Sequence, residues 1–123
     1  MRWILIIAAL SGALSVMMGA ATRHLGGDAE ILQTALRYHQ LHSVALLALG
    51  LFAINKPFSM AIVLPAVLFT VGIVIFSGSL YALSLLDLPA LGYATPVGGM
   101  SFILGWLSLI WLARHETPSD KGK

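Results

Sequence analysis

The stretch Ala35-Leu36-Arg37-Tyr38-His39-Gln40-Leu41-His42-Ser43 decides how the rest of the chain is interpreted. It places an arginine, a tyrosine, two histidines and a glutamine within six residues, beside some of the most apolar sequence in the chain. The purely apolar residues that follow, 43–54, number only twelve, whereas a helix that crosses a bilayer needs about twenty. A crossing helix must therefore begin near Leu36, which brings Tyr38, His39 and His42 to the membrane boundary or inside it.

The composition indicates a membrane protein. Of the 123 residues, 59% are hydrophobic and 10% are charged, and the mean hydropathy is +0.92. Soluble domains carry about 25% charged residues, and a chain this short cannot bury so much apolar surface in water. The basic residues are scattered, so nucleic-acid binding is not expected. The sequence contains no cysteine, which excludes disulfides, thiolate metal sites and a cysteine nucleophile.

The first apolar segment covers residues 3–22, which contain no charged residue and are long enough to span a bilayer. Because Arg2 precedes this segment, a cleaved signal peptide is the alternative interpretation. Gly26-Gly27 indicates a turn, and Asp28 is well placed to cap the helix that follows. Residues 29–37 are amphipathic, as is typical of a helix that lies in the membrane interface.

Three further spans are predicted. The second covers about residues 36–54, and the third covers 58–86, which is long for a straight crossing and contains Pro65 as the expected cause of a kink. The fourth covers 96–113, where Thr95-Pro96 is typical of a helix start, with threonine as the cap and proline in the first turn.

An even number of spans places both termini on the same side of the membrane. The other side would carry Arg23 and Arg37, whereas the side of the termini carries Arg2, Lys56, Arg114, Lys121 and Lys123. Because cytoplasmic loops are enriched in basic residues, both termini are predicted to be cytoplasmic, with a polar tail at 114–123. The predicted fold is all-α: a single domain, residues 1–123, forming a four-transmembrane-helix bundle with a short interfacial helix before the second span.

Small residues at helical spacing predict how the spans pack. Lipid tails are as apolar as leucine, so helices associate in a bilayer mainly where small residues allow close approach. A phosphate-binding loop is not indicated, because no strand precedes Gly98-Gly99. The stripes of small residues also favour an oligomer if any of them faces outward. The glycines predicted to mediate packing are Gly12, Gly19, Gly72, Gly78, Gly98 and Gly105.

Polar side chains within the apolar segments are the candidate functional residues, because ionisable groups are costly to hold inside a membrane. Tyr38 and His42 are four residues apart and share a helix face. For His42, an interhelical hydrogen bond, with Tyr81 as a candidate partner, is as consistent with the sequence as a ligand site. With the predicted topology the candidates gather in the outer half of the bundle: His24, Tyr38, His42, Ser77, Ser79, Tyr81 and Thr95.

Other polar residues have plainer interpretations. Arg37 and His39 are assigned to anchoring at the membrane surface, where long and aromatic side chains are favoured. A haem or metal site formed by His24, His39 and His42 is a weaker hypothesis, because no carboxylate or thiolate accompanies them. The carboxylates of Asp28 and Glu30 fall in a predicted helix cap without a nucleophile signature. No enzymatic activity, cofactor or metal site is therefore predicted.

Several motifs resemble those of a small bacterial inner-membrane family, domain of unknown function 423. Three of them are Phe76-Ser77-Gly78-Ser79-Leu80-Tyr81, Thr95-Pro96-Val97-Gly98-Gly99 and Gly105-Trp106. Tyr38 and His42 match the family's Tyr-x-x-x-His pattern, and Gly19-Ala20 followed by His24 matches the end of the family's first helix. The chain departs by reading Gly-Ala-Ala-Thr-Arg-His where the family usually has Gly-Ala-Phe-Gly-Ala-His, and by His39 where glutamine is common. The resemblance implies a four-helix inner-membrane protein and supplies no activity.

The sequence therefore predicts a non-enzymatic protein of the bacterial inner membrane. The first hypothesis is an oligomeric permeation, transport or ligand-binding unit with a polar site in its outer half. The alternative is an interaction or assembly subunit of a larger membrane complex, and a haem or metal redox protein is the third. The expected partners are the lipid bilayer and either further copies of the chain or another membrane protein.

Overall fold

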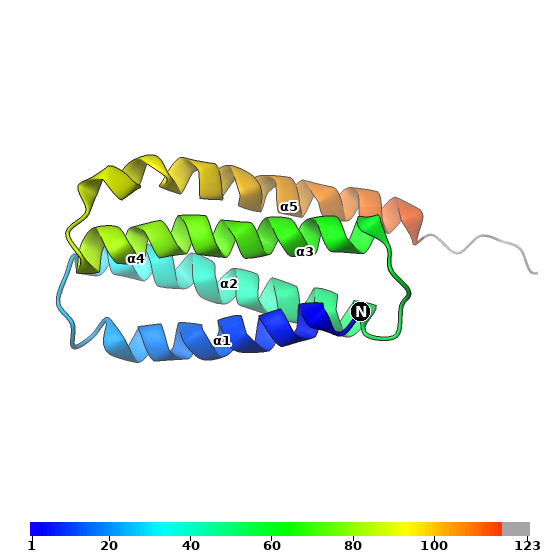
Figure 1. Ribbon diagram of the computed structural model, residues 1–123, viewed down its shortest axis with the longest axis horizontal. Helices are drawn as coiled ribbons and strands as arrows, with labels where there is room; N and C mark the ends of the chain where they lie inside the picture. Colours follow the sequence, from blue (N-terminus) through cyan, green and yellow to red (C-terminus); the bar gives the residue numbers. More distant parts are fainter. Residues whose placement is uncertain (117–123) are drawn as a thin grey trace, which may run out of the picture.

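The computed structural model describes residues 1–116, which are helical apart from short connections, and this confirms the predicted all-α class. Four helical rods lie side by side (Figure 1). The first rod is α1 and the second is α2. The third consists of α3, η1 and α4 without a break, and the fourth consists of η2 followed by α5. The predicted tail falls mostly at residues 117–123, outside the described part. The elements are α1 (Trp3–Ala21), α2 (Ala29–Ala53), α3 (Met60–Gly72), η1 (Ile73–Ser77), α4 (Gly78–Leu85), η2 (Pro89–Tyr93) and α5 (Thr95–His115).

Three of the rods are long and apolar enough to cross a membrane: Trp3–Ala21, Met60–Leu85 and Pro89–His115. The rod formed by α2 is not among them, because even its most apolar part contains the polar residues Arg37, His39, Gln40 and His42. Length does not distinguish it, since α2 contains 25 residues.

The expectation of a separate interfacial helix before the second span is wrong. Residues 29–53 form one continuous helix. Asp28 caps its start by accepting hydrogen bonds from the backbone N–H groups of Glu30 and Ile31, at 2.9 and 3.1 Å. No glycine or proline follows until Gly50, so nothing in the sequence interrupts the helix between its amphipathic and apolar parts.

The third rod is irregular at η1 rather than at Pro65. Pro65 lies buried inside α3, whereas Ile73–Ser77 form a π-helical turn, which inserts an extra residue into a helix and often marks a functional position. This turn places Ser77 against α2, where its hydroxyl donates to the carbonyl oxygen of Ala35 at 2.8 Å. The sequence did not predict the π-turn.

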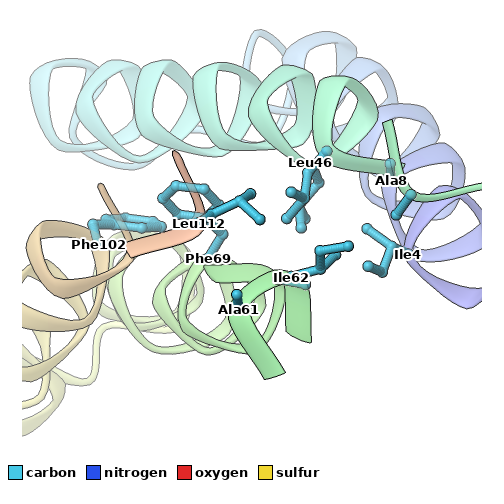
Figure 2. Packing of buried hydrophobic residues seen from close by; sticks show 11 residues of the cluster. Ile4, Ala8, Leu46, Ala61, Ile62, Phe69, Phe102 and Leu112 are labelled. Carbon is cyan, nitrogen blue, oxygen red and sulfur yellow. The ribbon is translucent and has the colours of Figure 1, made fainter. Parts of the chain in front are cut away.

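The apolar core lies along the axis between the rods. Figure 2 shows side chains from all four rods meeting there, with Phe69 and Phe102 from the third and fourth rods beside Leu46 and Ile62. Phe69, Ile62 and Leu46 are each no more than 1% exposed. Large buried side chains therefore fill the centre of the molecule.

Glycines allow the closest approaches between rods. A Cβ atom at Gly98 would lie 2.3 Å from the backbone nitrogen of Phe76, and one at Gly72 would lie 2.3 Å from the Phe102 ring. At Gly105 the added atom would lie 2.7 Å from the Phe69 ring, whereas at Gly19 it would make an ordinary contact of 3.5 Å with Leu36. The third and fourth rods are therefore pressed together along Gly72, Gly98 and Gly105.

Gly12 and Gly78 are not at close approaches between the rods of a single copy, so their predicted packing role stays a prediction. No atom of another part of the chain lies within 4 Å of a Cβ built at either position, although Gly12 belongs to a stripe of small residues and Gly78 is adjacent to one. Spacing identifies such a stripe but not the side on which a neighbouring helix lies. Gly50, which the sequence did not single out, is in close contact instead: its Cβ would lie 2.9 Å from the backbone of Leu5.

Contacts at the two ends tie the rods together. The N-terminal amine donates to the carbonyl oxygens of Ala53 and Lys56, and Lys56 forms an ion pair with Glu116, so the N-terminus and the end of α5 lie at the same end (Figure 1). At the opposite end Gly26 and Gly27 have φ angles of 77° and 84°, which glycine adopts without strain. This arrangement agrees with an even number of crossings.

Candidate functional site

Two buried histidines lie near the middle of α2. His39 and His42 are each 1% exposed, and they face Ser11 near the middle of α1 and Trp106 near the middle of α5. The sequence placed its candidate polar site in the outer half of the molecule. In the structure the histidines lie near the middle of the rods, because α2 begins at Ala29, seven residues before the expected start at Leu36.

His39 is the centre of a four-residue hydrogen-bond chain. Its Nδ1 atom is 3.0 Å from the hydroxyl oxygen of Tyr81, and its Nε2 atom is 3.2 Å from the Ser11 hydroxyl. Ser11 in turn lies 2.6 Å from the hydroxyl of Ser43, which donates to the carbonyl oxygen of His39 at 2.8 Å. The chain thus joins α1, α2 and α4.

Counting protons along this chain fixes the direction of every bond. The hydroxyl of Ser43 donates its only proton to the carbonyl oxygen of His39, so it must accept a hydrogen bond from Ser11. Ser11 has then used its own proton, so it accepts from the Nε2–H of His39. The remaining ring atom, Nδ1, accepts from the hydroxyl of Tyr81. These contacts are all satisfied by a neutral His39 that carries its proton on Nε2.

His42 has the opposite tautomer. Its Nδ1 atom lies 2.7 Å from the carbonyl oxygen of Tyr38, which can only accept, so the proton is on Nδ1. Nε2 is therefore free to accept from the indole N–H of Trp106, at 3.0 Å. The ring also stacks on Phe102, with centroids 3.6 Å apart and planes 12° from parallel. His42 thus holds α2 against α5 through both a hydrogen bond and a ring contact.

The ring nitrogens of both histidines are occupied by protein partners. Within residues 1–116, no buried side-chain nitrogen or oxygen is left without a hydrogen bond. A metal ion at His39 or His42 would first have to displace Ser11, Tyr81 or Trp106. The same described residues contain no group of three or more histidine and carboxylate side chains placed to hold a metal. The arrangement suits neutral, structural histidines in an apolar interior.

The other predicted site residues separate into different places. Tyr38 packs on Phe76 and stacks on His42, as expected for residues that share a helix face. Ser79 bonds to Thr95 at 2.7 Å, so Thr95 does not cap α5, which begins at Thr95 without a side-chain cap. Tyr81 contacts His39 and not His42. His24 is exposed in the connection between α1 and α2, away from the buried histidines.

His39 differs most from its predicted role. The sequence assigned it to the membrane surface together with Arg37, but the structure buries it and leaves Arg37 exposed. Its spacing of four residues from Ser43 was an available signal, since that spacing places both residues on one helix face. Trp106 was quoted only within a family motif and was not predicted as a site residue. It lies in the middle of a candidate span, whereas tryptophans that anchor a helix lie near its ends.

A hollow of about 220 Å³ opens sideways between α1 and the third rod. Ser11 and His39 are among its lining residues, so the hydrogen-bond chain borders the outer surface of the molecule at this point. Thr70, whose hydroxyl donates to the carbonyl oxygen of Ala66 at 2.7 Å, adds a polar group to one wall. The other lining residues are apolar: Ile7, Leu10, Leu14, Ile73 and Val74.

Comparison with known proteins gives one family. Residues 8–99 match the family described as "Protein of unknown function (DUF423)". The "UPF0382 inner membrane protein YgdD" of Escherichia coli K12 is 38% identical over 115 residues, which cover 89% of this chain and 87% of that protein. The "UPF0382 membrane protein YwdK" of Bacillus subtilis is 32% identical over 116 residues, covering 89% of this chain and 94% of the relative.

A third relative, a "UPF0382 membrane protein" of Haemophilus influenzae, is 36% identical over 115 residues, covering 87% of this chain and 90% of its own length. No solved structure matches the chain. The relatives therefore extend over nearly the whole molecule and include α2, but their names state a location and no activity.

Proposed function

Because the chain belongs to the DUF423 family of small membrane proteins of unknown function, we propose that it crosses the inner membrane four times with both termini in the cytoplasm. Three rods have the length and composition of spans, and α2 lies alongside them with its polar interior groups paired. The inner-membrane location is carried over from the name of the Escherichia coli relative. The excess of basic residues at the end that holds the N-terminus supports the orientation.

The topology can be tested by cysteine labelling, for which the natural absence of cysteine is convenient. Leu25→Cys and Asn55→Cys place exposed thiols in the connections at opposite ends of α2. We expect a membrane-impermeant maleimide, added to intact cells whose outer membrane is permeable to it, to label the first variant and not the second. Lysed cells provide the control, because both thiols should then react. Labelling of both variants, or of neither, in intact cells would contradict four crossings.

We further propose that the protein is a non-enzymatic interaction subunit, which binds either further copies of itself or another membrane protein. The observation that carries this proposal is the closed interior: His42 is stacked and doubly hydrogen-bonded, and Phe69 and Leu46 fill the centre. Because the buried polar groups satisfy one another, the specific contacts of the protein are made by its outer surface. Permeation along the axis of a single copy has less support for the same reason.

The size of the extracted protein tests this proposal. Two tagged forms are coexpressed at native level and extracted directly into polymer-bounded lipid discs. We expect the protein to migrate as an assembly larger than one copy, and copurification of the two tags would identify the partner as another copy. Growth competition serves as the control that the tagged forms are functional. A particle from these membranes that contains one copy and no other protein would contradict the proposal of an interaction subunit.

A second candidate function, binding of an apolar ligand from the bilayer, is favoured by the lateral hollow above Ser11 and His39. Val74→Trp would fill this hollow from its exposed wall without replacing any residue of the hydrogen-bond chain. Mass spectrometry of organic extracts from the purified protein should then show a bound apolar compound that the variant lacks. Met100→Trp, on the exposed surface of α5, is the matched control. Equal extracts from all three proteins would count against a ligand at this position.

A further inference from the structure

The outer surface of α2, together with the neighbouring part of α1, carries a second feature. Three hollows follow one another along this surface and share lining residues, with Gln40 common to all three. The first, of about 490 Å³, is lined by Arg23 and His24, and the second, of about 400 Å³, by Arg37. They lie at the end of the molecule that is opposite the N-terminus.

The two arginines lie on either side of Gln33 and Gln40, which line both hollows. Within the described residues neither guanidinium group is in ion-pair distance of a carboxylate, and no acidic side chain lines either hollow. The nearby carboxylate of Asp28 accepts hydrogen bonds from the start of α2. The lining of these two hollows therefore combines two guanidinium groups, an imidazole and two amides, while the exposed carboxylate of Glu30 lies outside it in the first turn of α2. A guanidinium group binds phosphate through paired N–H donors.

The third hollow continues from this charged end toward the middle of the molecule. It measures about 390 Å³ and is walled by small residues of α1 and by Val44 and Leu47 of α2. On the α1 side it includes Gly12, where an added Cβ would meet no atom within 4 Å. A charged end that continues into a narrow apolar trough has the shape and polarity of a lipid molecule lying along a helix pair.

We propose that this surface is a binding site for one anionic phospholipid. Its phosphate group would be held by Arg23 and Arg37, with Gln33 and Gln40 as further donors, and one acyl chain would lie in the trough past Gly12. The charge complementarity selects a phospholipid over a second copy of the chain, because a second copy would bring the same two arginines to a twofold contact. The side chains proposed to bind the phosphate take no part in closing the interior, whereas Ser43 belongs both to the wall of the trough and to the buried hydrogen-bond chain.

Native mass spectrometry of the full chain in detergent tests the proposal. Dioleoyl phosphatidylglycerol is the probe, and dioleoyl phosphatidylcholine, with the same acyl chains and no net charge, is the comparison. We expect phosphatidylglycerol to be retained about tenfold more strongly, and each of Arg23→Gln and Arg37→Gln to reduce its retention by about tenfold. Arg2→Gln, at the far end of α1, is the matched control and should change retention less than about twofold.

A variant of the trough separates the acyl chain from the headgroup. Gly12→Leu occupies the open space beside Gly12, and we expect it to weaken the retention of both phospholipids. Added inorganic phosphate should not change lipid retention in either the original protein or this variant. Equal retention of the two lipids, or retention unaffected by both arginine variants, would overturn the proposal. If Gly12→Leu instead changed only the number of copies in the particle, the trough would be an interface between copies and the proposal would be wrong.

Discussion

Replacement of Gly98 by alanine should destabilise the protein by about 3 kcal/mol, at the upper end of what overpacking usually costs. The added Cβ atom would lie 2.3 Å from the backbone nitrogen of Phe76 and 2.7 Å from its Cα atom. A side chain can rotate away from such a clash, but a backbone cannot, so α5 must separate from η1. The free energy of unfolding in mixed micelles, followed by helical circular dichroism during titration with a denaturing detergent, measures the effect.

The neighbouring residue provides the control. Gly99 is in the same turn of α5, but the nearest atom to its Cβ would be 3.8 Å away, which is an ordinary contact. Gly99→Ala should therefore be neutral or stabilising by up to about 1 kcal/mol, since alanine favours a helix more than glycine does. If the two substitutions changed the stability equally, the close approach of α5 to η1 would not exist in the folded protein.

The helices themselves could be predicted because their signals are local. Charge-free length, the cap at Asp28 and the paired glycines at 26 and 27 identified the elements and most of their connections. The π-turn at Ile73–Ser77 could not be predicted in this way, because its stability depends on what it contacts: Ser77 bonds to Ala35 of α2, and Gly98 of α5 leaves room for Phe76. These contacts join residues that are far apart in the sequence.

The site was predicted in part for a related reason. The shared face of Tyr38 and His42 follows from helix geometry, and the two rings do stack. Helix geometry alone does not predict which partner each histidine has. Their spacing of three residues turns His39 toward α1 and α4 and His42 toward α5. Which of two adjacent faces meets a tyrosine or a tryptophan is set by how the rods are arranged around α2.

The second large effect is expected at His42. His42→Ala removes a ring that stacks on Phe102 and leaves the indole N–H of Trp106 without its acceptor, so we expect a loss of about 3 kcal/mol. The same unfolding titration measures it. His24→Ala is the matched control, because His24 is exposed, and it should change the stability by less than about 0.5 kcal/mol.

A double-mutant cycle with Trp106→Phe separates the hydrogen bond from the packing. Phenylalanine at position 106 keeps an aromatic ring beside Phe69 but removes the donor to His42. We expect a coupling energy of about 1 kcal/mol between the two positions, within the range measured for hydrogen bonds between helices in membranes. Additive losses would mean that the bond contributes nothing and that His42 acts by its ring alone. A cost for His42→Ala no larger than that of His24→Ala would contradict the closed interior, and with it the inference that the protein acts through its outer surface.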